Sequence, residues 1–340
     1  MLIRAIIYLT RPVYWDILLF MESTPMNEPK SLQEAIVYFA DPDNCIDYLA
    51  VRRWPDGIVI CPMCGSDSVS SFNRTRRTWK CSSHHAKREF SIKVGTVMED
   101  SPIGLDKWLT ATWMVLNCKN GVSSCEIARD VRITQKSAWF MLHRIRLALH
   151  DESTGKLSGE VEVDETFIGG KARNMHIDKR ERRITGTGGK DKTIVFGALE
   201  RGGKVKANVV SDRKKKGLQA QVKAHVEAGS ALYSDALNSY DGLANEFAHQ
   251  VVDHAEQYVN GKVHTNGLEN FWSLLKRGLN GTYVSVEPFH LFRYLDEQVF
   301  RYNNRATKDN KATDADRFTA ALLNFSGKRL TFSSLTGKPN

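Results

Sequence analysis

Three acidic residues in the second half of the chain have the types and the spacing to support phosphodiester chemistry. Asp164 interrupts an apolar strand pattern, Asp235 ends the strand pattern ALYSD, and Glu269 lies in a helical pattern. Cleaving a phosphodiester requires an activated oxygen nucleophile and a stabilised leaving oxygen. Two Mg²⁺ ions held about 3.5–4 Å apart by carboxylates provide both. We therefore predict that these three acids hold two Mg²⁺ or Mn²⁺ ions.

Lys276 follows Glu269 by seven residues. Because this spacing is two helical turns, both side chains are expected on one helix face, where Lys276 would hold DNA phosphate. Each acid alone has an ordinary alternative explanation, since aspartate at a strand end commonly forms a turn and a helical glutamate is usually solvated. Together, however, the three acids lie on a strand, a strand and a helix in this order, which favours one shared site over three unrelated roles.

The elements that must position these acids form a mixed α/β pattern. Predicted strands cover 159–170, 192–200, 204–212, 231–236 and about 250–253. A helix is predicted over 217–229, another shortly after Tyr240, and a long helical part over 266–304. The sequence between the first two strands is basic and rich in glycine, which predicts a loop at 171–192. Strands followed by alternating helices and strands predict an α/β fold with a mixed sheet.

A cysteine group in the first half predicts a zinc ribbon. Cys61 and Cys64 form a C-x-x-C pair, and Cys81 with His84 forms a C-x-x-H pair, with sixteen residues between the two pairs. Two such pairs can supply four tetrahedral zinc ligands from two turns, and four protein ligands leave no open position for catalysis. His84 is the predicted fourth ligand because it keeps the x₂ spacing, while His85 stays open as the alternative.

Residues 121–146 predict a helix-turn-helix. Ser123 or Ser124 can cap a first helix, and Thr134 can cap a second helix that carries apolar residues at helical spacing. The start of the second helix, where base contacts are made in this motif, holds Gln135, Lys136 and Ser137. An ordinary α-hairpin is the open alternative.

Basic residues gather at three further places, where they would contact DNA phosphates or form a solvated charged surface. These are Arg74, Arg76, Arg77 and Lys80 between the zinc knuckles, the run Lys179–Arg183, and the run Arg213–Lys216.

Composition excludes two classes of protein. In 340 residues, 41% are hydrophobic, which is too many for a largely disordered chain, and no apolar run approaches the ~18 residues of a membrane span. The net charge of +9 favours a polyanionic partner such as nucleic acid. The six cysteines do not form a disulfide framework, so we expect a reducing cytoplasm. The apolar first twenty residues lack a cleavage site and are expected to be an over-long start rather than a signal peptide.

The quoted motifs resemble a known family, the bacterial insertion-sequence transposases with an N-terminal zinc ribbon and a DDE catalytic domain of ribonuclease H-like fold. The resemblance covers about residues 31–310 and rests on CPMCGS with CSSH, EVDETFIGGK, YSDALNSY and HTNGLENFWSLLKRGLNGTYVSV, with YNNR near the end. It implies that Asp164, Asp235 and Glu269 form the DDE triad, with Lys276 as the lysine that follows it. It further implies metal-dependent cleavage at transposon ends, then attack of the freed 3′-hydroxyl on target DNA.

The resemblance also implies partners. These are double-stranded DNA, namely terminal inverted repeats and target, and a second copy of the chain in a dimer or larger assembly. We expect the protein in the cytoplasm with the nucleoid, and no membrane partner. The rival hypotheses are a zinc-ribbon and helix-turn-helix regulator without catalysis, and a nuclease of the same fold without strand transfer.

The predicted organisation has five parts. These are an N-terminal extension (1–30), a helical lead with the zinc ribbon (31–100), a helix-turn-helix segment (101–152), the ribonuclease H-like catalytic domain (158–310) and a C-terminal tail (311–340).

Overall fold

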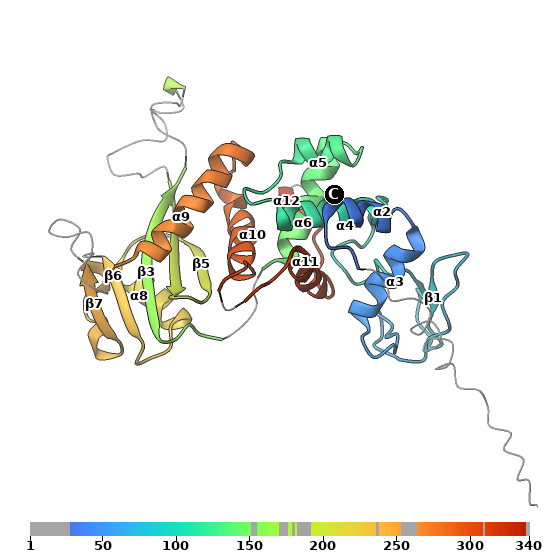
Figure 1. The fold of residues 1–340 in the computed structure, drawn as a ribbon, viewed down its shortest axis with the longest axis horizontal. Helices are drawn as coiled ribbons and strands as arrows, with labels where there is room; N and C mark the ends of the chain where they lie inside the picture. The colour runs from blue at the N-terminus through green and yellow to red at the C-terminus, as the bar shows by residue number, and fades with distance from the viewer. Residues whose placement is uncertain are drawn as a thin grey trace, which may run out of the picture. The chain divides into compact units, whose positions relative to one another are not determined.

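The computed structural model describes residues 28–150, 155–169, 176–178, 181, 192–235, 238–252, 264–308 and 310–337 (Figure 1). Contacts divide the chain into two compact units, Met1–Trp113 with Asp314–Asn340, and Met114–Thr313, and each is described by itself. The features predicted for residues 1–20, and almost all of the loop predicted at 171–192, lie outside the described residues. Among the helices that are described, none has the length and apolarity needed to cross a bilayer.

The first unit begins with two short helices, α2 (Leu32–Phe39) and α3 (Pro42–Arg53). The first helix ends at Phe39 with Ala40 as its C-cap. Asp41 caps the second, because its carboxylate accepts a hydrogen bond from the Asp43 N–H at 2.8 Å and Pro42 starts α3. The zinc-ribbon segment that follows contains a two-stranded antiparallel sheet, β1 (Trp79–Lys80) and β2 (Glu89–Phe90).

The C-terminal part of the chain completes the first unit. Residues 311–340, which we expected to be a tail, instead contain α11 (Asp314–Leu323) and α12 (Phe332–Thr336). Phe318 of α11 is fully buried, and its ring lies 4.9 Å from that of Trp113, which belongs to α4 (Leu105–Asn117). The apolar face of α11 therefore packs in the core of this unit. The sequence did not predict this burial, because the helix is short and its flanking residues are polar.

The second unit is built on a five-stranded mixed sheet with the order β5-β4-β3-β6-β7. Its strands are β3 (Glu160–Ile168), β4 (Thr193–Glu200), β5 (Val205–Val210), β6 (Ala231–Asp235) and β7 (Ala248–Val252). β3, β4 and β5 pair antiparallel, whereas β6 pairs parallel with β3, and β7 pairs parallel with β6. The predicted strands and the mixed sheet are confirmed.

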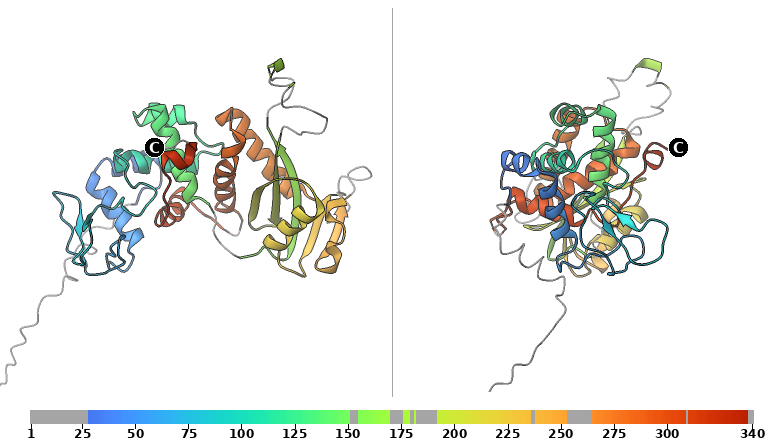
Figure 2. Two further views of the ribbon diagram at one scale, coloured as in Figure 1. Left: turned by 180° about the vertical axis from the view of Figure 1, so that it is seen from behind. Right: turned by 90° about the vertical axis from the view of Figure 1, so that its right-hand side faces the viewer.

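Helices cover both faces of this sheet. Val195 and Leu199 of β4 pack in one core with α9 (Asn266–Gly278) and α10 (Leu291–Asn303), while Phe196 and Ala198 pack in the other with α8 (Lys215–His225). Figures 1 and 2 show α9 running along the sheet with α10 beside it. The helix predicted over 266–304 is interrupted by irregular turns, η4 (Leu279–Tyr283) and η5 (Pro288–His290). The helix expected after Tyr240 is a single 3₁₀ turn, η3 (Leu243–Asn245).

The predicted helix-turn-helix segment forms α5 (Ser124–Asp130) and α6 (Gln135–Ala148). Ser123 caps α5 in a reciprocal capping box with Glu126, and Thr134 caps α6. The second half of α6 is buried, and Arg146 donates to Glu297 of α10 at 2.7 Å with both side chains at most 1% exposed. The segment therefore packs as part of the second unit. The predicted domain boundaries at 100, 152 and 310 divide the chain more finely than these two units do, and they stay predictions.

Candidate catalytic site and zinc centre

The sheet register brings Asp164 and Asp235 to neighbouring positions. β3 and β6 are parallel, with Glu160 opposite Ala231 and Glu162 opposite Tyr233. Continuing this register by two residues sets Asp164 beside Asp235, on strands that lie about 4.8 Å apart. Residues at one level of a parallel pair point to the same face, so the two carboxylates share a face of the sheet.

Asp164 lies in a crowded negative environment. Burial, followed by the nearby carboxylates of Glu165 and Asp235, raises the pKa of Asp164 to about 7. The indole N–H of Trp272 donates a hydrogen bond to its Oδ2 at 3.0 Å and opposes that rise. Clustered acids whose mutual repulsion raises a pKa are typical of a site that takes a cation.

Helix α9 carries the other two predicted residues. Glu269 and Lys276 are exposed, while Leu268, Phe271, Trp272 and Leu275 form the buried stripe of the helix. Within the described part of the chain, Asp164, Asp235 and Glu269 do not form a compact group of candidate metal ligands like the group of cysteines and a histidine in the first unit. The structure thus brings Asp164 and Asp235 together and holds α9 against their strand through Trp272.

Close approach of α9 to the sheet depends on Gly197. This glycine of β4 lies opposite Asp164, and a Cβ atom there would lie 2.6 Å from Cζ2 of Trp272. Real Cβ contacts are never that short, so a side chain at this position would displace the indole.

Glu162 is a further residue of this site, and our sequence interpretation missed it. It is 1% exposed, and its carboxylate accepts hydrogen bonds from the Leu268 N–H and from Arg201 Nε, both at 2.9 Å. Thr265, at the start of α9, makes no side-chain cap, so Glu162 satisfies an N–H of the first turn instead. The alternation in EVEVDE, which sets Glu162 and Asp164 on one strand face, is the signal that could have identified it.

Glu165 forms a second buried contact on the opposite face of β3. Its carboxylate accepts hydrogen bonds from Tyr240 Oη at 2.6 Å and from Arg213 Nε at 2.8 Å. Tyr240 belongs to the turn η2 (Asn238–Tyr240), which follows the end of β6. Arg213, from one of the predicted basic runs, is therefore paired inside the unit.

The zinc centre differs from our prediction at one ligand. Cys61, Cys64, Cys81 and His85 have donor atoms that all lie within 4.8 Å of one another, whereas His84 is exposed. The longer loop after Cys81 lets the imidazole of His85 reach back to 3.5 Å from Cys61 Sγ. Three thiolates and one imidazole fit a closed tetrahedral Zn²⁺ site. Our choice of His84 is therefore corrected to His85.

The lowered pKa of the Cys81 thiol favours metal binding. Burial raises its pKa, but hydrogen bonds that include the one from His85 outweigh this and lower it to about 6. A thiol with this pKa is largely thiolate at neutral pH, and the thiolate is the form that binds zinc.

The basic residues between the two zinc-binding pairs form ion pairs with acidic residues. Arg74 and Arg77 both pair with Asp43 of α3, at 3.5 and 3.2 Å, and Arg76 pairs with Glu89 at 3.3 Å. All of these pairs are exposed, so they are weak and leave the arginines available to a polyanion.

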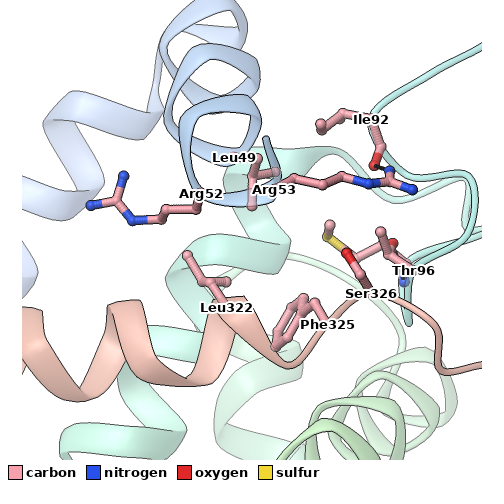
Figure 3. Close-up of a pocket in the computed structure, with 9 residues that line it drawn as sticks. Leu49, Arg52, Arg53, Ile92, Thr96, Leu322, Phe325 and Ser326 are labelled. Carbon is pink, nitrogen blue, oxygen red and sulfur yellow. Dashed lines mark hydrogen bonds between the residues drawn. The ribbon is translucent and has the colours of Figure 1, made fainter. Parts of the chain in front are cut away.

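A cavity in the first unit is too small to be a substrate site. It lies between α3 and α11, is lined by residues that include Leu49, Met98 and Phe325, and has a volume of about 20 Å³ (Figure 3). Arg53 passes beside it and donates to the Ile92 carbonyl at 2.8 Å. This volume holds about one water molecule.

The strand order, the parallel β3–β6 pair and the helix packed across them define a ribonuclease H-like fold. Residues 156–303 match the family described as an ISXO2-like transposase domain, and residues 40–85 match a transposase zinc-ribbon domain. The two matches together cover more than half of the chain. The chain therefore belongs to the insertion-sequence transposases that combine these two domains.

The chain is also similar to a protein from a transposable element. The chain is 28% identical over 255 residues to an uncharacterized protein in transposable element ISH50 of Halobacterium salinarum. The alignment covers 71% of this chain and 84% of the relative. The transposase and zinc-ribbon domains imply that the chain binds DNA.

Proposed function

We propose that this protein cuts DNA at the ends of an insertion sequence and joins the freed 3′-hydroxyl groups to target DNA. The observation that supports this function best is the parallel pairing of β3 with β6, with Asp164 and Asp235 at one level and α9 packed against the same strands. Family membership agrees with it.

Asp164, Asp235 and Glu269 would hold two Mg²⁺ or Mn²⁺ ions in this reaction. Their carboxylate oxygens are the hard ligands that such cations prefer, and the raised pKa of Asp164 marks negative charge that a cation would neutralise. When bound, the ions supply Lewis-acid stabilisation of the attacking and leaving oxygens. Asp235 is the last residue of β6, so its carboxylate lies at the carboxyl end of that strand.

The chemistry comprises two transfers at phosphorus. In cleavage, a water oxygen bonds to phosphorus, the bond from phosphorus to the 3′-oxygen breaks, and that oxygen leaves as a 3′-hydroxyl. In joining, this hydroxyl bonds to a target phosphorus, whose own 3′-oxygen leaves. Lys276, exposed two turns after Glu269, would hold a DNA phosphate beside the acids.

Other parts of the chain would bind DNA without taking part in the chemistry. Gln135 and Lys136 are exposed at the start of α6, where a helix-turn-helix contacts bases. The zinc ribbon would use its exposed arginines on phosphate, with Zn²⁺ stabilising its fold. Two copies of the chain would act together, one on each end of the element.

The test uses the full-length protein with DNA that carries the element's terminal repeats, a target plasmid and Mn²⁺. Joined products support a transposase. Cuts without joining would support a nuclease, and binding without cuts would support a regulator. Asp164→Asn and Asp235→Asn should lower the cleavage rate more than about 100-fold, because each removes a negative metal ligand. Asp241→Asn, an exposed aspartate of the same unit, is the matched control and should leave the rate unchanged.

A further inference from the structure

Trp272 connects the two elements that carry the first and third predicted acids. It lies on α9, three residues after Glu269, and it is 4% exposed. Its Nε1–H donates to Oδ2 of Asp164 on β3 at 3.0 Å. Since residues three apart lie on neighbouring positions of a helix surface, one side chain spans from the position of Glu269 to the carboxylate of Asp164.

The surroundings leave the indole little freedom. Gly197, directly opposite Asp164 in the β3–β4 pair, has no side chain, and the Trp272 ring occupies that space. The ring also contacts Phe271 at 5.2 Å between centroids. A buried indole N–H costs free energy when it has no acceptor, and here the acceptor is the Asp164 carboxylate.

This hydrogen bond restricts the rotation of the carboxylate. Oδ2 of Asp164 accepts from Trp272, and the carboxylate also accepts a hydrogen bond from the Glu165 backbone. Second-shell donors of this kind orient a metal-binding carboxylate, and their loss typically weakens metal binding about 10–100-fold.

We propose that Trp272 is a positioning residue that holds the Asp164 carboxylate in its metal-binding orientation and fixes its separation from Glu269 through α9. This inference rests on the proposed function, because it assumes that Asp164 binds a divalent ion. It assigns the aromatic residue of α9 a role beyond packing and accounts for the glycine on β4.

The test removes the N–H and keeps the ring. The tryptophan analogue 3-benzothienylalanine, which has sulfur in place of the N–H, is incorporated at position 272 in the full-length protein. The matched control places the same analogue at position 108, because Trp108 is 1% exposed and donates its N–H to Ser101 Oγ at 3.1 Å, far from the acids in sequence. Trp272→Phe and Trp108→Phe repeat the comparison with natural residues.

Two measurements separate orientation from general stability. Mn²⁺ affinity is measured by electron paramagnetic resonance without DNA, and the Mn²⁺ concentration for half-maximal cleavage is measured with DNA. We expect the analogue at position 272 to weaken Mn²⁺ binding about 10-fold or more and to raise the half-maximal concentration by a similar factor, with little change in DNA affinity. The analogue at position 108 should change neither quantity.

The outcomes are distinct. Unchanged Mn²⁺ affinity with the analogue at position 272 overturns the inference and leaves the proposed function standing. Equal weakening at positions 272 and 108 also overturns it, because the effect is then one of lost stability. If the wild-type protein shows no Mn²⁺ binding that Asp164→Asn removes, the proposed function fails, and the inference fails with it.

Discussion

Replacing Glu162 should loosen the helix that carries Glu269. The Glu162 carboxylate is 1% exposed and accepts hydrogen bonds from the Leu268 N–H and Arg201 Nε, both at 2.9 Å. His264 Nδ1 lies 3.4 Å from the same carboxylate. Three groups at or beside the start of α9 therefore converge on one acid of β3.

The magnitude follows from these contacts. Glu162→Ala leaves the Leu268 N–H with the Thr265 carbonyl at 3.0 Å as its acceptor, so the loss of the side-chain cap costs about 0.5–1 kcal/mol, the low end of the usual range. It also leaves Arg201, whose side chain is 17% exposed, without its buried partner, and breaking a buried pair costs about 3–5 kcal/mol. Because Arg201 keeps the His264 carbonyl as an acceptor at 2.7 Å and some solvent, we expect a total of about 3–4 kcal/mol.

The assay is urea unfolding of the full-length protein, combined with hydrogen exchange of the α9 amides. Glu160→Ala is the matched control, because Glu160 lies on the same strand and pairs with the same Arg201 at 3.3 Å, but its side chain is 44% exposed. The control should cost less than about 1 kcal/mol. Equal effects of the two substitutions, or unchanged exchange in α9 with Glu162→Ala, would refute the reasoning.

Three further predictions concern other parts of the chain. Burial and nearby cations lower the pKa of His143 to about 2, so below about pH 6.5 the unfolded chain binds a proton that the folded chain does not. From pH 6.5 to 5, the free energy of unfolding should therefore fall by about 2 kcal/mol through this residue. His143→Phe should remove that part of the pH dependence in denaturation curves. His85→Ala should lower the zinc content measured by elemental analysis, whereas His84→Ala should not, and the reverse result would contradict the ligand correction. Gly197→Ala should destabilise the protein by about 1–3 kcal/mol, because the new Cβ meets a buried indole. The control Gly217→Ala in α8 has ordinary space around the new Cβ and should stabilise the protein by about 0.4–1 kcal/mol. Equal shifts of the two variants in thermal melting would contradict the packing argument.

Much of this architecture could be predicted from local sequence signals. Strand alternation and apolar runs identified the strands of the sheet, and cap residues identified the helix starts near Ser123 and at Thr134. These signals are local, since they depend on one element and its immediate flanks. The acids Asp164 and Asp235 were identified because each is polar at a place where a strand pattern is apolar.

The missed features depend on contacts between distant parts of the chain. Glu162 contacts Leu268, which is 106 residues away. Strand alternation sets Glu162 on the face of Asp164, but it sets the exposed Glu160 there too, so this signal alone does not show which glutamate is buried. The choice between His84 and His85 depends on the path of the loop after Cys81, which the spacing alone does not determine. The C-terminal helix α11 is short, and its burial depends on Trp113 and other residues far away in sequence. The catalytic assignment of Asp164, Asp235 and Glu269 stays a proposal.

The most direct measurement for this proposal is anomalous X-ray diffraction from crystals of the full-length protein soaked in Mn²⁺. The account predicts anomalous density beside Asp164 and Asp235, within reach of Glu269, and no such density in Asp164→Asn crystals. Density that lies away from these carboxylates, or that persists at full height in Asp164→Asn, would contradict the claim that these acids jointly bind the catalytic ions.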